Sequence, residues 1–125
     1  MSNYFEVDLS DEPTPTTDPD GTIRWRLPNG NFHREDGPAI EYDSGTKVWY
    51  QNGKFHRVDG PAIEWSDGNK SWYQSGELHR INGPAIEHGG RTEWWFHGEE
   101  MTEEEFRQRL LRYEQLDAEI HDYAD

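Results

Sequence analysis

The stretch HRVDGPAIEW (residues 56–65) recurs almost unchanged in this 125-residue chain, as HREDGPAIEY (33–42) and HRINGPAIEH (79–88). The period of 23 residues also holds outside this phrase, for Gly30, Gly53 and Gly76 and for Trp49, Trp72 and Trp95. The segment EWWFHGEE (93–100) adds a degenerate fourth unit that is one residue short. Self-similarity at a fixed period of this size indicates stacked structural repeats.

Each unit alternates turn signals with strand-like runs. Asn52-Gly53 and its counterparts favour a tight hairpin turn, because both residues tolerate positive φ. Asp59-Gly60-Pro61 and its counterparts form a second turn, after which proline is expected to start a strand, since it cannot donate to a ladder. The sequence therefore predicts a mainly β protein: an antiparallel meander of stacked β-hairpin repeats, about seven or eight strands at two per repeat.

Aromatic residues are expected on both faces of this sheet. Side chains two apart in a strand share a face, so Tyr42 should lie beside Ile40 and Trp65 beside Ile63. The tryptophans of the repeats, such as Trp49, should point to the opposite face from the tyrosines that follow them. Some ring surface should therefore remain exposed.

The segment WYQNGKFHRVDGPA (49–62) resembles a MORN-type repeat, and this resemblance covers about residues 21–98. The residues on family-like positions are Trp49, Tyr50, Gly53, Lys54, His56 and Gly60. The repeat ends in Arg-x-Asp-Gly-Pro-Ala, which departs from the simpler Gly-x-Gly ending of that family. The HR-x-DGPA phrase is also similar to repeat proteins of bacteriophages and bacteria. The resemblance implies an open β-meander used for partner or lipid binding rather than catalysis.

The two ends of the chain differ from the repeats, which divides it into segments 1–20, 21–98 and 99–125. Residues 102–121 are predicted to form a helix, which begins with a Thr102–Glu105 capping box. Its apolar face consists of Phe106, Leu110, Tyr113, Leu116 and Ile120. The helix is expected to cap the last hairpin or, alternatively, to dock on a partner. Residues 11–20 should be extended or disordered, and residues 4–9 could add an edge strand.

The net charge of −14 is concentrated at the ends. Residues 1–20 contain six acidic and no basic residues, residues 21–98 ten acidic and nine basic, and residues 99–125 ten acidic and three basic. Such a field repels nucleic acid and anionic membranes and attracts basic proteins. The absence of cysteine, of a signal peptide and of a long apolar run favours the cytoplasm, here that of a bacterial host cell.

The repeated polar residues are interpreted as structural. His and Arg should hydrogen-bond the neighbouring turn and pair with aspartate, pinning each hairpin. The residues concerned are His33, His56, His79, Asp36, Asp59, Gly37, Gly60 and Gly83. Equivalent histidines should lie roughly 9–10 Å apart, too far for one metal ion, whose ligands lie at about 2 Å. No nucleophile–base set or phosphate loop is present, so no enzyme activity, metal or cofactor is expected.

The first functional hypothesis is a non-enzymatic inhibitor, which the phage resemblance places in a phage or mobile element. It would bind a basic, nucleic-acid-processing host defence protein, such as a restriction or CRISPR effector, with carboxylates standing in for phosphates. The acidic binding residues would be Glu99, Glu100, Glu103, Glu104, Glu105, Glu114, Asp117 and Glu119. The sheet would contribute Trp49, Trp72, Trp95, Arg34, Arg57 and Arg80.

Two alternatives remain open. The chain could be a MORN-like structural or immunity protein that binds a toxin or forms a homodimer through its sheet edges. It could also be a nucleotide sponge, in which Arg34, Arg57 and Arg80 clamp the ligand beside an aromatic surface.

Overall fold

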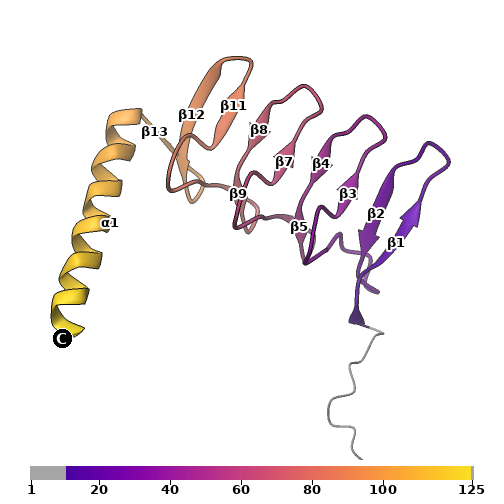
Figure 1. The fold of residues 1–125 in the computed structure, drawn as a ribbon, viewed down its shortest axis with the longest axis horizontal. Coiled ribbons are helices and arrows are strands. Elements are labelled where there is room, and N and C mark those ends of the chain that lie inside the picture. The colour runs from indigo at the N-terminus through magenta and orange to yellow at the C-terminus, as the bar shows by residue number, and fades with distance from the viewer. Residues whose placement is uncertain (1–10, 125) are drawn as a thin grey trace, which may run out of the picture.

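The computed structural model describes residues 11–124, which form thirteen short strands and one C-terminal helix (Figure 1). The prediction of a mainly β, antiparallel fold with a terminal helix is confirmed. The first strands are β1 (Thr14–Thr17), β2 (Ile23–Arg26), β3 (Ile40–Glu41), β4 (Lys47–Val48), β5 (Tyr50–Gln51) and β6 (Lys54–Phe55). They are followed by β7 (Ile63–Glu64), β8 (Lys70–Ser71), β9 (Tyr73–Gln74), β10 (Glu77–Leu78), β11 (Ile86–His88), β12 (Arg91–Phe96), β13 (Glu99–Met101) and the helix α1 (Glu103–Ala124).

Nine strands make one long sheet in the order β1-β2-β3-β4-β7-β8-β11-β12-β13. The other four make two separate ribbons, β5–β6 and β9–β10. Because the order in the long sheet follows the chain, the hairpins line up side by side along the long axis of the molecule (Figure 1). The long sheet is therefore a meander, and each complete repeat also forms a separate two-stranded ribbon.

The expected count of seven or eight strands was wrong because the run TKVWYQ is not one strand. On one side of Trp49, Val48 pairs with Ile40 and Ile63 of the long sheet. On the other side, Tyr50 pairs with Phe55 of the small ribbon. The ladder thus changes partners at the tryptophan, and a complete repeat contains four short strands instead of two.

Both expected segment boundaries also need correction. The sheet begins at Thr14, inside the segment 1–20, because β1 pairs antiparallel with β2 from Thr14↔Arg26 to Thr17↔Ile23. Pro15 lies in this exposed edge strand, where its missing N–H hinders further strand addition. At the other end, Glu99 and Glu100 lie in β13 and not in the helical segment. The expectation for residues 4–9 falls outside the described residues.

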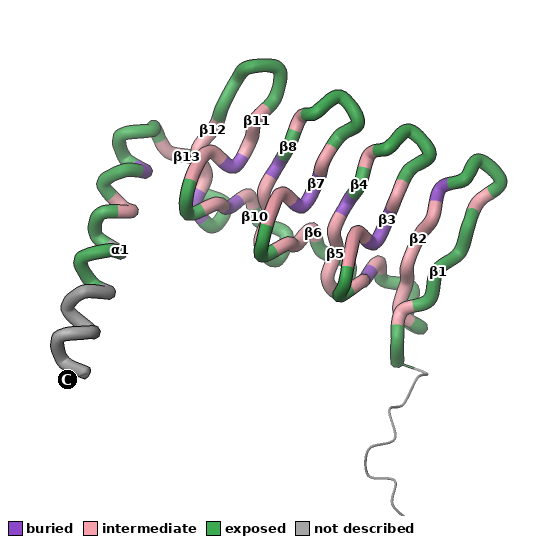
Figure 2. The backbone as a smooth tube through the Cα atoms, in the orientation of Figure 1, coloured by how far each residue is buried: buried purple, intermediate pink, exposed green. Residues whose placement is uncertain are grey.

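The core is a thin line along the sheet (Figure 2). Ile40, Val48 and Ile63 are buried in its centre. Four aromatic rings pack against these residues: Phe32, Tyr50, Phe55 and Tyr73. The centroids of successive rings in this row lie 5.1, 4.9 and 4.9 Å apart. The expectation of exposed ring surface is confirmed at Tyr42 and Trp65, which are 39% and 37% exposed.

Helix α1 is attached to the sheet by its first turns. The predicted capping box is present, since Thr102 N donates to Glu105 Oε1 (2.8 Å) and Glu105 N donates to Thr102 Oγ1 (3.1 Å). Phe106 is 5% exposed, whereas Leu111 and Leu116 are 57% and 53% exposed. Leu116 was expected on the packed face, but among the described residues no strand lies beside that part of the helix (Figure 1). Within residues 11–124, no helix is long and apolar enough to cross a membrane.

Candidate protein-binding surfaces

The repeated histidines connect each unit to the next. Nδ1 of His33, His56 and His79 accepts a hydrogen bond of 2.9 Å from a backbone N–H one unit further on. The donors are Asn52, Ser75 and His97, the three described non-glycine residues with positive φ. The prediction that histidine bonds the neighbouring turn is thereby confirmed, and the turn belongs to the following unit.

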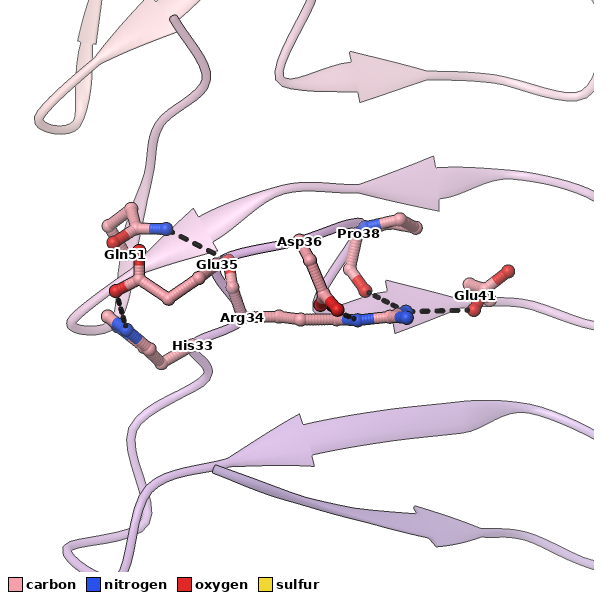
Figure 3. Close-up of polar contacts among 7 residues, drawn as sticks. All are labelled: His33, Arg34, Glu35, Asp36, Pro38, Glu41 and Gln51. Atoms are coloured by element: carbon pink, nitrogen blue, oxygen red, sulfur yellow. Dashed lines mark hydrogen bonds and ion pairs between the residues drawn. The ribbon is translucent and has the colours of Figure 1, made fainter. Parts of the chain in front are cut away.

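The repeated arginines are bonded within their own units. In the first unit, Arg34 Nε donates to Asp36 Oδ1 (3.0 Å), and its Nη1 donates to the Pro38 carbonyl (3.2 Å) and to Glu41 (3.3 Å) (Figure 3). Gln51 of the next unit donates to the Arg34 carbonyl (2.9 Å). The predicted pairing of Arg34 with Asp36 is confirmed, as is that of Arg57 with Asp59 (3.1 Å).

Glycine is required where the arginine side chain crosses its turn. A Cβ atom on Gly37, Gly60 or Gly83 would lie 3.0, 2.8 or 2.9 Å from Cζ of the arginine three residues earlier. These distances are too short for a carbon–carbon contact without displacement. The repeated glycines thus make room for the guanidinium groups.

Each guanidinium group also covers a tryptophan. Cζ of Arg57 lies 3.8 Å from the ring centroid of Trp49, and Arg80 lies at the same distance from Trp72. Arg34 covers Trp25 at 4.3 Å. The sequence analysis missed Trp25 because it precedes Trp49 by 24 residues instead of 23.

The arrangement of these arginines and tryptophans favours a structural role. A nucleotide would have to compete with the carboxylate, carbonyl and ring partners that each arginine already has. Trp95 differs from the other tryptophans, because its indole N–H donates to Glu93 (3.0 Å).

The structure brings five of the predicted acidic residues together where β13 meets α1. Glu99 and Glu100 come from β13, and Glu103, Glu104 and Glu105 from the first turn of the helix. Glu114 lies further along and is exposed. Asp117 and Glu119 belong to α1, but their side chains are outside the described part of the chain.

Two hollows flank this junction. One, of about 550 Å³, includes Arg109 and Arg112 in its wall beside the glutamates. The other, of about 470 Å³, contains no lysine or arginine in its wall. We call the second the Trp94 hollow; its lining consists of Thr92, Glu93, Trp94, Glu100, Met101, Thr102, Glu103 and Glu105.

The Trp94 hollow combines an aromatic ring with four carboxylates from three elements. Three of these carboxylates have internal partners: Glu103 binds Arg107 (2.6 Å), and Glu105 accepts from Thr102 N. Glu93 accepts from Trp95 and lies 3.7 Å from Arg91. Glu100 has no such partner among residues 11–124. Carboxylates around an aromatic face are suited to bind a guanidinium or ammonium group.

Trp94, Met101 and Glu93 were missed by the sequence analysis. The repeat itself contained a signal for Trp94, which stands where the preceding units have Ser71 and Val48. A large ring at a position that is otherwise small or aliphatic marks the last unit as different.

Among the described residues, no group of three or more His, Cys, Asp or Glu side chains is arranged to hold a metal ion. No family model matches the chain, and the comparisons with curated proteins and with solved structures found no match.

Proposed function

We propose that this protein is a non-enzymatic binding module that takes a basic segment of a partner protein at the Trp94 hollow. The observation that carries the proposal is a hollow whose wall contains Trp94, Met101 and four glutamates and no lysine or arginine. A basic segment would stack one side chain on the Trp94 ring and pair another with the carboxylate of Glu100, which has no internal partner among the described residues.

The charge distribution supports the same choice of partner. The segment 99–125 has ten acidic and three basic residues, whereas the repeats are nearly neutral. A field concentrated at one end steers a basic surface towards that end and increases the association rate. The repeat sheet then acts as the scaffold that holds β12, β13 and the first turn of α1 in place.

The partner that best fits this charge is a nucleic-acid-binding protein. Its basic groove would receive the carboxylates of β13 and α1 in place of phosphates, and the module would act as a competitive inhibitor. Two of these glutamates are partly neutralised inside the protein, Glu103 by Arg107 and Glu99 by Arg109. Recognition would therefore depend on the hollow as well as on the total charge.

A capture experiment with matched variants tests the proposal. The wild-type protein, Trp94→Leu and Trp95→Leu are immobilised and exposed to bacterial lysate at low salt. We expect the wild type and Trp95→Leu to retain a basic partner that added duplex DNA displaces, and Trp94→Leu to lose it. Equal retention by both variants would contradict the role of the hollow, and retention unaffected by DNA would contradict competition with nucleic acid.

A further inference from the structure

The contact between successive units includes one nitrogen atom of a titratable side chain, beside several backbone bonds. In the pair formed by the second and third units, His56 Nδ1 accepts from Ser75 N (2.9 Å), and Gly76 N donates to the Phe55 carbonyl (2.8 Å). The same two bonds join the other pairs, where His33 and His79 supply the imidazole. We propose that these three imidazoles form a proton-sensitive latch, which holds the units together when neutral and releases them when protonated.

The chemistry of the acceptor requires the neutral form. An imidazole nitrogen accepts a hydrogen bond only when it has no proton, and both nitrogens of the charged ring are donors. Protonation of His56 would place an N–H opposite the N–H of Ser75, so the bond would be replaced by a repulsive contact. Ser75 has a φ of 50°, which is uncommon for a residue other than glycine, and its turn would lose one of its hydrogen bonds to the preceding unit.

The groups around His33 fix the tautomer that the latch needs. Nε2 of His33 lies 2.9 Å from Glu35 Oε1, so the ring proton is placed on Nε2 and Nδ1 is left as the acceptor. This carboxylate therefore orients the imidazole of the first junction.

The groups around the other two imidazoles differ. His56 lines a groove together with Glu35, Asp36, Arg57 and Asp59, in which Arg57 is paired with Asp59.

His79 has a mostly apolar surrounding. It stacks on His97 with ring centroids 3.9 Å apart, near Phe96 and Arg109. Burial lowers the pKa of His79, the nearby His97 lowers it further, and Glu77 opposes both effects. The third junction should therefore open at a pH below the range in which an exposed histidine titrates.

Loss of the latches would act on the whole array. In a repeat protein, each unit contacts only its neighbours, so stability is approximately the sum of unit and junction contributions. The three latches lie at successive junctions and use the same bond, so acid weakens all of them. This inference concerns the sheet and is independent of what binds at the Trp94 hollow.

Histidine-to-asparagine variants test the latch. The Asn carbonyl oxygen can lie close to the position of Nδ1 and accept the same bond, but it does not titrate. Urea unfolding is measured at pH 7.5 and 5.5 for the wild type, the triple variant His33→Asn/His56→Asn/His79→Asn and the control His88→Asn, which changes an exposed histidine outside the latches. We expect the wild type and the control to lose stability at pH 5.5 and the triple variant to lose less than half as much. An equal loss in the triple variant would overturn the proposal.

A second measurement on the wild-type protein does not require a variant to fold. NMR detects a scalar coupling across an N–H···N hydrogen bond, here between the Ser75 amide and His56 Nδ1. We expect this coupling at neutral pH and its disappearance as the ring titrates. A proton found on Nδ1 of His56 at neutral pH would overturn the proposal.

Discussion

The guanidinium group of Arg57 lies flat over the Trp49 ring, with Cζ 3.8 Å from the ring centroid, and its Nη1 donates to Glu64 at 2.7 Å. Nε donates to Asp59, and Nη1 also donates to the Pro61 carbonyl (3.1 Å). One side chain therefore joins the turn, the following strand and the tryptophan at which the ladder changes partners. The same set of contacts recurs in the neighbouring units, which explains why the phrase is repeated.

Removal of this side chain should destabilise the protein. Arg57→Ala loses the stacking contact and leaves Glu64 without its partner, which we expect to cost about 2–3 kcal/mol in the free energy of unfolding. Urea denaturation followed by circular dichroism measures this cost. Arg91→Ala is the control, because its side chain is 81% exposed and its ion pair with Glu93 is long, at 3.7 Å. A change beyond about 0.5 kcal/mol there would indicate a general effect of charge.

The glycine under the guanidinium group should be sensitive to a single methyl group. Gly60→Ala places Cβ 2.8 Å from Arg57 Cζ, and the displacement of the arginine should cost about 1–3 kcal/mol. A double-mutant cycle identifies the cause, since the cost of Gly60→Ala should shrink once Arg57 is alanine. Costs that simply add would show that the strain lies in the backbone instead.

Attachment of the helix should depend on one buried ring. Phe106→Ala is expected to cost about 3 kcal/mol and to lower the helical circular dichroism signal, because the remainder of α1 has little contact with the sheet. Leu111→Ala, on the exposed side, should change stability by less than about 0.5 kcal/mol. If the two variants behaved alike, Phe106 would not be the anchor.

Stability should rise with pH through the range in which His79 titrates. Because burial lowers the pKa of His79 in the folded protein, the unfolded chain binds more protons at pH values between the folded pKa and the ordinary histidine pKa of 6.5. Its contribution is complete above pH 6.5 and decreases as the pH falls towards the folded pKa. Titration of the imidazole by NMR checks the direction, and a folded pKa above 6.5 would contradict it.

Much of the fold follows from local patterns. The period, the Asn-Gly turns and the capping box are signals that depend on a few adjacent residues. The Arg–Asp pairing could also be anticipated, because the two residues are only two positions apart. The break at Trp49 could not, since Val48, Trp49 and Tyr50 all favour strands, and only the choice of pairing partner separates them.

The site depends on long-range placement, which one sequence does not reveal. Glu93, Glu100 and Glu103 line the same hollow as Trp94 only because β12, β13 and α1 converge there. The strand β1 was missed for a different reason. Its composition, rich in proline and threonine, is typical of extended segments without a partner, and it becomes a strand only because β2 offers an edge with which it can pair. The amphipathic pattern of α1 likewise does not reveal how much of the helix packs against the sheet.

The central claim is that the Trp94 hollow, and not the net charge alone, selects a basic partner. The most direct measurement is the dissociation constant for the captured partner with two variants that remove the same charge. Glu100→Gln/Glu103→Gln changes the hollow, and Asp11→Asn/Glu12→Gln changes the opposite end of the sheet. The account predicts a loss of about tenfold or more for the first variant and less than about twofold for the second. Equal losses for both variants would show that the partner responds only to total charge and would contradict a binding site at the hollow.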